Sequence, residues 1–479
     1  MTKPTSARRW AVRASAIAVF LLAAAGSTQA LATTQAGPPR MAMTGAPVTN
    51  PYSPAYHHAY RHGVVPTIAQ LAKMRGWARR HPAAIHALSA TDLNYGGGID
   101  GIGVTTGQEK VYLVFYGSQW GTVTGTQPNV TLSGDPAKEA PYVQQFLTGL
   151  GTGGELWSGV MTQYCQGVAT GAQSCPASNT QHVAYPTGGA LAGVWVDEST
   201  SSPGAATAHQ LGVEAVKAAG HFGNTTAAAN RDVQYVILSP TGTDPDSYEQ
   251  NGFCAWHDYN GDTTLDGGGA VASPYGDIAF TNLPYIPDAG ASCGQSFVNS
   301  GSAGNLDGLS IVEGHEYAET ITDQNPAGGW TDSSGAETGD KCAWITPGTA
   351  GGSFDLKTST GTYAVQTSWA NDGNKGAGAC EGKHPVVING GDKVTVTNPG
   401  SQSSKKGTKV SLQIQASDNS LGQTLTYQAS GLPAGLTIKS TTGLISGTPT
   451  TTGTRTVTVT VTDTTKASGK ATFSWTIHT

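Results

Sequence analysis

Two apolar runs decide the fold of the central part of the chain: Val111-Tyr-Leu-Val-Phe-Tyr116 and Val233-Gln-Tyr-Val-Ile-Leu238. Both are rich in β-branched and aromatic residues, and Ser239-Pro240 closes the second, so they predict two buried strands. Apolar residues recur at helical spacing over 206–221 and again over 307–323. Strands that alternate with helices predict a layered α/β or α+β domain.

This main domain is predicted to span residues 91–389. The same patterns add a third strand at 278–283 and a helix over 142–164 that the glycines at 149–154 interrupt. The predicted fold class is therefore multidomain. It combines an α/β or α+β, metallohydrolase-like main domain with disulfide-bonded loops and a C-terminal β-sandwich.

Charge is scarce in this chain. Of its 479 residues, 65 are glycine and only 12 % are Lys, Arg, Asp or Glu, against about 25 % charged residues in an average globular protein. Apolar residues still make up 38 %, which excludes a disordered chain, and glycine has no strict period, which excludes a collagen. The net charge of -6 is not clustered, so we expect no nucleic-acid partner.

Six cysteines, an even number, suit three disulfides in an oxidising compartment. Their order suggests local pairs: Cys165 with Cys175, Cys254 with Cys293, and Cys342 with Cys380. Other connectivities are open to six cysteines, so this pairing is a hypothesis. Each bridge restricts the unfolded chain and contributes roughly 2–4 kcal/mol to folding, which long glycine-rich loops need.

The N-terminus predicts export. Residues 1–13 carry four basic residues and no acid, 14–25 form an apolar run, and Ala30-Leu-Ala32 offers small residues at a signal-peptidase site. Residues 1–32 are therefore predicted to be a signal peptide. The mature protein is expected to be secreted and extracellular, free or surface-associated, with no membrane span. An uncleaved membrane anchor is the alternative.

Residues 33–90 differ from the rest of the chain by their histidines and arginines. Five of the 12 histidines lie here, and 67–80 has the apolar spacing of a helix. The segment is predicted to be either a linker with one surface helix or a propeptide that covers a site until it is removed.

Residues 390–479 contain no glutamate and no cysteine, and 454–463 alternates Thr and Val with period two. Short strands of this kind predict a β-sandwich. The segments 431–438 and 443–449, which end in Gly-Thr-Pro, resemble the immunoglobulin-like (cadherin-like) domains of bacterial secreted proteins. The resemblance implies a spacer or adhesion module. Some cadherin-like relatives bind calcium, but Asp418 and Asp463 alone do not predict a calcium site.

Glutamate is concentrated in one place. The chain has only 11 glutamates, and Glu313, Glu316, Glu319 and Glu337 lie within 25 residues. In a helix, residues i and i+4 share a face with about 6 Å between them, so His315 and Glu319 can reach one ion. The pattern matches a His-Glu-x-x-His zinc helix, whose outer residues are ligands and whose inner glutamate is the general base, except that glutamate replaces the second histidine. A carboxylate widens the choice of metal towards calcium or manganese.

A catalytic zinc also needs a third protein ligand and an open position for water. The sequence offers five candidates for this ligand: Asp323, Asp332, Glu337, Asp340 and His257. Cysteines near the last three would anchor their segments through disulfides. The alternative is an acidic helix without a metal, in which His315 packs against an aromatic residue. A weaker calcium-loop pattern at 258–266 lacks the required glycine and glutamate, so an exposed turn is expected there.

The block 307–345 resembles the exordium or phosphate-induced protein family and its bacterial secreted relatives. The resemblance rests on His315-Glu-Tyr-Ala-Glu-Thr-Ile-Thr-Asp323, Trp330 and Glu337-Thr-Gly-Asp-Lys-Cys342, with a looser likeness over 110–380. The family is extracellular and associated with cell walls and growth. The resemblance implies a site at the matching residues His315, Glu316, Glu319, Glu337, Asp340 and Cys342, and it leaves the reaction open.

Two functions remain open. The first is a secreted metal-dependent hydrolase, in the first instance a peptidase, with zinc held by His315, Glu319 and one of Glu337, Asp340 or His257. Glu316 would take a proton from the attacking water. Its partner would be an extracellular protein or a cell-wall polymer, and residues 33–90 would keep it latent. The second is a non-catalytic cell-wall or adhesion protein in which the same cluster is structural, as a calcium site.

Overall fold

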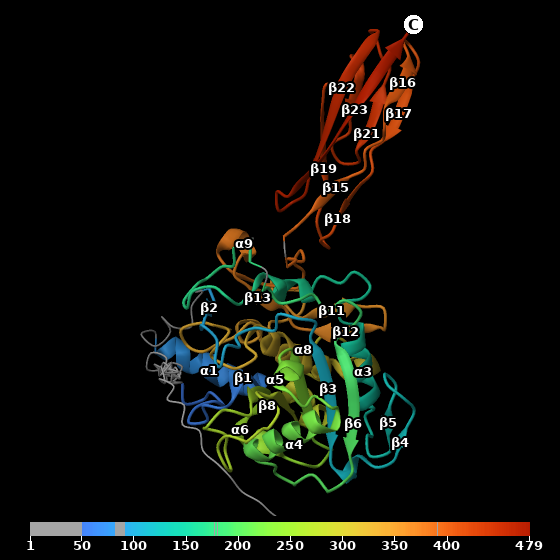
Figure 1. Cartoon of the computed structure of the whole chain (residues 1–479). Coiled ribbons are helices and arrows are strands. Elements are labelled where there is room, and N and C mark those ends of the chain that lie inside the picture. Colours follow the sequence, from blue (N-terminus) through green and yellow to red (C-terminus); the bar gives the residue numbers. More distant parts are fainter. Residues whose placement is uncertain (1–49, 82–91, 177, 180, 390) are drawn as a thin grey trace, which may run out of the picture. The chain divides into compact units, whose positions relative to one another are not determined.

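The computed structural model describes residues 50–81, 92–176, 178–179, 181–389 and 391–479, and Figure 1 shows their elements. The expected signal peptide at 1–32 lies outside the described residues. None of the helices in these described ranges is long and apolar enough to cross a membrane.

A six-stranded mixed sheet forms the centre of the main domain, in the order β1-β8-β9-β7-β3-β6. The last four strands in this order run parallel to one another, whereas β8 and β1 are each antiparallel to the strand beside them. The strands are β1 (His62–Pro66), β8 (Phe253–Tyr259), β9 (Ala279–Leu283), β7 (Val233–Leu238), β3 (Lys110–Tyr116) and β6 (Leu191–Asp197). The three strands predicted from sequence are all present in this sheet.

Alternation along β3 requires a cover on both faces of the sheet. Leu113 and Phe115 pack into one core together with helix α8 (Asp307–Thr322), and Val114 and Tyr116 into a second core together with α4 (Ala208–His221). Successive residues of a strand point to opposite faces, so a strand that is apolar on both sides needs a layer on each. The main domain is thus a three-layer α/β/α arrangement (Figure 1).

Two predicted helices differ from expectation. All 16 residues of α8 are buried, so the helix lies inside the domain instead of presenting one apolar side. The helix predicted over 142–164 is two elements, α3 (Glu139–Gly149) and the 3-10 helix η2 (Ser158–Gln163). Gly151, Gly153 and Gly154 have positive φ, which ends a helix.

The described part of the N-terminal segment contributes one strand to the sheet. β1 pairs with β8, and the buried Arg61 forms an ion pair of 2.7 Å with Asp246. Helix α1 (Ile68–Arg80) follows, capped by Thr67, whose hydroxyl accepts the Gln70 N–H. A propeptide or linker at 33–90 would therefore include an edge strand of the sheet.

The C-terminal residues form a β-sandwich. One sheet has the order β16-β23-β22-β19 and the other β17-β21-β20. The strands are β16 (Gln402–Lys405), β17 (Val410–Gln413), β19 (Thr426–Ser430), β20 (Leu436–Ile438), β21 (Leu444–Gly447), β22 (Gly453–Thr462) and β23 (Ser468–His478). Val457, Val459 and Val461 are buried in its core, which confirms the period-two prediction.

The cysteines pair locally, as predicted: Cys165–Cys175, Cys254–Cys293 and Cys342–Cys380. The second bridge joins β8 to the 3-10 helix η4 (Gly290–Cys293). The third begins two residues after Asp340. Two of the three bridges therefore hold segments that carry predicted site residues.

Candidate metal centre

The predicted site residues come together where α8 contacts β8 and β1. His315 and Glu319 lie one helical turn apart, with 2.9 Å between Nε2 and Oε2. His257 of β8 is 3.2 Å from Glu337, measured from Nε2 to Oε2, and Asp340 Oδ1 is 3.8 Å from His315 Nε2. The fold thus brings together His315, Glu319, Glu337, Asp340 and His257, although a catalytic zinc site needs only three protein ligands.

The carboxylate of Glu319 lies at the centre of this group. Its Oε1 accepts hydrogen bonds from the backbone N–H groups of Gly339 and Asp340, at 2.9 and 2.8 Å. Its Oε2 faces two imidazoles, with His315 Nε2 at 2.9 Å and His257 Nε2 at 3.9 Å. One oxygen therefore fixes the following loop on the helix, and the other is left for a ligand.

Gln366 orients His315, and no sequence pattern pointed to this residue. Its Oε1 lies 3.2 Å from His315 Nδ1, and its Nε2 donates to the carbonyl of Gly339 at 2.9 Å. When Nδ1–H donates to Gln366, the neutral imidazole has no proton on Nε2. That nitrogen faces Glu319 Oε2 and, at 3.1 Å, the carbonyl oxygen of Gly63. Both oxygens can only accept hydrogen bonds. Either a proton on Nε2 or a cation must therefore lie between this nitrogen and the two oxygens.

The two imidazoles respond to burial in different ways. Burial lowers the pKa of His315, but Glu319 and then Asp340 outweigh burial and raise it to about 9. Burial, followed by the neighbouring His62 and His315, holds the pKa of His257 well below its usual range. At neutral pH and with no cation bound, His315 is therefore charged and His257 is neutral.

Burial has the opposite effect on the carboxyl groups, because it raises their pKa values. Burial, followed by Asp323 and Glu319, raises the pKa of Glu337 well above its usual range, and burial and Glu319 raise that of Asp340 to about 8. The described ion pairs of the carboxylates in this group are with imidazoles alone. Several buried acids are costly unless a cation compensates them.

The group fits a divalent cation. Two triads of side chains share Glu319: His257, Glu319 and Glu337, and His315, Glu319 and Asp340. Within each triad, one ligand atom of every residue lies within 4.8 Å of the other two. Glu319 Oε2, Glu337 Oε1 and His257 Nδ1 are buried without a hydrogen-bond partner. Imidazole nitrogen and carboxylate oxygen together are zinc ligands.

Glu316 lies beside this group. Its carboxyl is buried, and neither oxygen has a hydrogen-bond partner. Burial, followed by Glu319 and Glu313, raises its pKa well above the usual range. A carboxyl held neutral by its surroundings can carry a proton during catalysis.

Asp323 and Asp332, the other two candidates, organise the loop after α8. Asp323 accepts backbone N–H groups of Ala327 and Gly329, at 2.8 and 2.5 Å. Asp332 accepts N–H groups of the turn at 334–336 and forms an ion pair with Lys341 at 3.3 Å. Neither belongs to a triad of ligand atoms in the described residues.

The N-terminal segment covers the centre. Gly63 has a φ of 52°, and a Cβ on it would lie 2.0 Å from Glu319 Oε2 and 2.6 Å from His257 Cδ2. Only glycine leaves room for this approach. The side chains of His257, His315, Glu319 and Glu337 are at most 1 % exposed, while Asp340 is 20 % exposed. The backbone at Gly63 thus lies directly against Glu319 and the two imidazoles.

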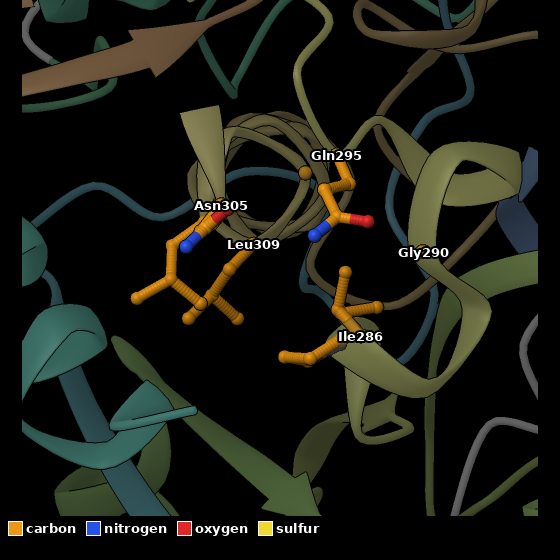
Figure 2. Close-up of a pocket in the computed structure, with 8 residues that line it drawn as sticks. Ile286, Gly290, Gln295, Asn305 and Leu309 are labelled. Carbon is orange, nitrogen blue, oxygen red and sulfur yellow. The ribbon is translucent and has the colours of Figure 1, made fainter. Parts of the chain in front are cut away.

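Two hollows lie apart from this group. Figure 2 shows one between α7 (Ile286–Ala289), η4 and the start of α8, where the side chains of Ile286, Gln295, Asn305 and Leu309 gather. It is lined by no ionisable side chain. A wider hollow of about 370 Å³ lies at Cys380 and is lined by Thr367, the neighbour of Gln366 in sequence. Neither contains the ligand group.

A second acidic group lies in the C-terminal domain. Asp392, Asp418 and Asp463 are the three acids of 391–479, and they bring one carboxylate oxygen each within 4.8 Å of one another. Asp463 is 4 % exposed, and each carboxylate keeps one buried oxygen without a hydrogen-bond partner. The sequence analysis considered Asp418 and Asp463 alone, and folding adds Asp392 to them. Sequence spacing could not show this, since the three lie on separate strands or loops.

The turn at 258–266 also differs from expectation. Asp258 belongs to strand β8 and is fully buried, and Asn260 is 5 % exposed. The side chain of Asn260 accepts the Ile278 N–H and donates to the carbonyl of Val271. The prediction of an exposed turn is therefore wrong for its first half, because β8 continues into it.

Comparisons with known proteins bear on the C-terminal domain. Residues 393–478 match a family model described as "Putative Ig domain". Similar solved structures include a "putative alpha-galactosidase" from Bacteroides fragilis (26 % identity, 18 % of this chain and 18 % of that chain, TM-score 0.16) and titin domain M7 (14 %, 18 % and 96 %, TM-score 0.16). Protocadherin gamma B7 cadherin domains 1–4 are a third (16 %, 25 % and 27 %, TM-score 0.16). No curated protein matches the chain.

These findings make the C-terminal β-sandwich an Ig-like domain. The match spans about a fifth of the alpha-galactosidase chain, and TM-scores this low carry no argument about activity. The family model ends short of the main domain. The resemblance of the main domain to the exordium family therefore stays a prediction.

Proposed function

We propose that this chain is a secreted metal-dependent hydrolase, in the first instance a peptidase, whose N-terminal segment keeps it latent. One observation carries the proposal: His257 and His315 converge on a single buried oxygen of Glu319, with Glu337 and Asp340 beside them. Three disulfides and an Ig-like domain support an extracellular place of action.

Each residue of this centre has its own role. His257, His315, Glu319 and Glu337 would hold a zinc ion, with Asp340 at the exposed rim. When bound, zinc supplies a Lewis acid that polarises a carbonyl group and activates water. Glu316 takes the proton of the attacking water and passes it to the leaving amine. Gln366 keeps His315 in the orientation that presents Nε2 to the ion.

Latency follows from the position of β1. While Gly63 lies against Glu319 and His257, substrate has no access, and the Glu316 carboxyl holds its proton. Withdrawal of this strand would admit water and substrate together. The Ig-like domain would attach the enzyme to an extracellular protein or a cell-wall polymer.

The test combines metal content with activity. The purified protein is assayed for bound metal and for casein hydrolysis, before and after limited proteolysis that removes residues up to 66. We expect about one zinc ion at this centre and activity only after cleavage, and loss of activity in Glu316→Gln with zinc retained. Glu249→Gln, an exposed glutamate of α6 (Tyr248–Asn251), is the matched control. Cleaved protein that binds zinc but never hydrolyses peptides would contradict the proposal.

A second candidate function is a non-catalytic extracellular adhesion or cell-wall protein that binds calcium. The convergence of all three acids of 391–479 favours it, because carboxylate oxygens are the ligands that calcium prefers. In this case the protein would bind no transition metal, and calcium would only raise its melting temperature.

A further inference from the structure

A second group of ligand-type side chains lies near the candidate centre and shares no residue with it. His62 comes from β1, Asp258 from the end of β8, and Asp262 from the turn that follows. One ligand atom of each lies within 4.8 Å of the other two, and His62 Nε2 is 3.7 Å from Asp262 Oδ2. The group thus joins two segments that are almost two hundred residues apart in sequence.

The two carboxylates keep oxygens available towards each other. Asp258 is fully buried; its Oδ1 accepts the Tyr259 N–H at 2.7 Å, and its Oδ2 has no hydrogen-bond partner. Asp262 Oδ1 accepts the Thr264 N–H at 2.5 Å, which leaves Oδ2 towards His62. A buried oxygen that only accepts, next to a second carboxylate and an imidazole, needs a proton or a cation.

We propose that His62, Asp258 and Asp262 hold a zinc ion that fastens the N-terminal segment to the sheet. One imidazole and two carboxylates are a donor set that zinc accepts, with water in the remaining position. Because His62 lies on the segment and both aspartates lie on the body of the domain, binding of the ion and docking of the segment are one equilibrium. Loss of the ion loosens β1 next to Gly63.

This proposal is independent of catalysis at the first centre. It concerns a different set of side chains, and its measurement is the number of ions bound. A proton shared by Asp258 and Asp262 would satisfy the same oxygens without any metal. The experiment must therefore count ions and assign each ion to its own group.

The full-length protein is stripped with a chelator, reloaded with Zn²⁺, desalted and analysed for zinc per chain. We expect two ions in the wild type and one fewer in His62→Gln and in Asp262→Asn, both checked for folding by circular dichroism. Asp266→Asn is the control, because Asp266 is exposed on the same turn. Limited proteolysis within 50–66 should become at least tenfold faster in His62→Gln than in the wild type at equal zinc.

Variants of the two centres separate the outcomes. Glu337→Gln removes a ligand of the first centre only. If the wild type binds one ion and Glu337→Gln binds none, the His62 group holds no zinc, and this proposal is overturned while the first centre stands. If the wild type binds a single ion, and Glu337→Gln keeps it whereas His62→Gln loses it, the second site stands and the first fails. Zinc counts that are equal in the wild type, His62→Gln and Asp262→Asn also overturn the proposal.

Discussion

Glu319 combines a structural contact with a position open to a ligand. Its Oε1 receives two backbone N–H groups of the loop 337–342, and its Oε2 faces His315 and His257. A histidine at this position could not accept two backbone hydrogen bonds and also face a shared ion, since a neutral imidazole has one acceptor nitrogen. A glutamate in place of the second histidine of a zinc helix can therefore bind the loop with one oxygen and face an ion with the other.

The protonation of the group predicts how zinc and pH interact. In the metal-free protein the pKa of Asp340 is raised to about 8 and that of His315 to about 9. Groups with raised pKa stabilise the fold at low pH, and this stabilisation is lost as pH rises through those values. Zinc bound at the proposed centre would compete with the same protons, so its binding should strengthen as pH rises. The melting temperatures of zinc-loaded and chelated protein should therefore diverge progressively as pH rises, up to about pH 9, where His315 has lost its proton. A difference that stays constant would contradict zinc binding here.

Gln366 should act on zinc through His315. Gln366→Leu removes the acceptor at His315 Nδ1 and the donor to Gly339. Loss of such an outer partner weakens metal binding about 10- to 100-fold. A competition titration with a coloured chelator measures this, with the exposed Gln108→Leu as control. An unchanged zinc affinity would show that Gln366 only packs.

At the scale of elements, the edge strand β1 and the helix α8 form one unit. α8 is buried along its whole length, and β1 covers the part that carries His315 and Glu319. A strand at the edge of a sheet has one row of backbone groups outside the ladder, so β1 can leave the sheet by losing its pairing with β8 alone.

Gly63→Ala tests this contact. The substitution places a methyl group 2.0 Å from Glu319 at a φ of 52°, which should lower the free energy of unfolding by about 2 kcal/mol or more. If β1 keeps the protein latent, Gly63→Ala should also raise casein hydrolysis without proteolysis. Gly76→Ala in α1 has no close neighbour within 3.5 Å of the new carbon and should stabilise the protein by about 0.5–1 kcal/mol. Equal urea midpoints for the two variants would contradict the close approach.

At the scale of the whole molecule, the scarcity of charge makes each acidic cluster informative. Residues 391–479 hold only three acids, and all three meet. Burial, followed by Asp418 and Asp463, raises the pKa of Asp392 to about 6. Calcium should relieve this repulsion.

We therefore expect calcium to raise the melting temperature of this domain by several degrees, as about 1–3 kcal/mol of binding would do. Asp463→Asn should abolish the shift, and the exposed Glu198→Gln should not change it. Differential scanning calorimetry of the full chain with calcium and with a calcium chelator measures the effect. A shift that survives in Asp463→Asn would assign calcium to another part of the protein.

Local patterns in the sequence determined much of this protein. Apolar runs gave the strands at 110–116 and 233–238, period-two alternation gave β22, and helical spacing gave α8 with His315 and Glu319 one turn apart. These features depend on neighbours along the chain, which periodicity records. Tertiary structure alone decided that Gly63 lies on Glu319, that Gln366 orients His315, and that Asp392 joins Asp418 and Asp463. Such contacts join residues far apart in sequence, and they exist only once the sheets and helices have packed.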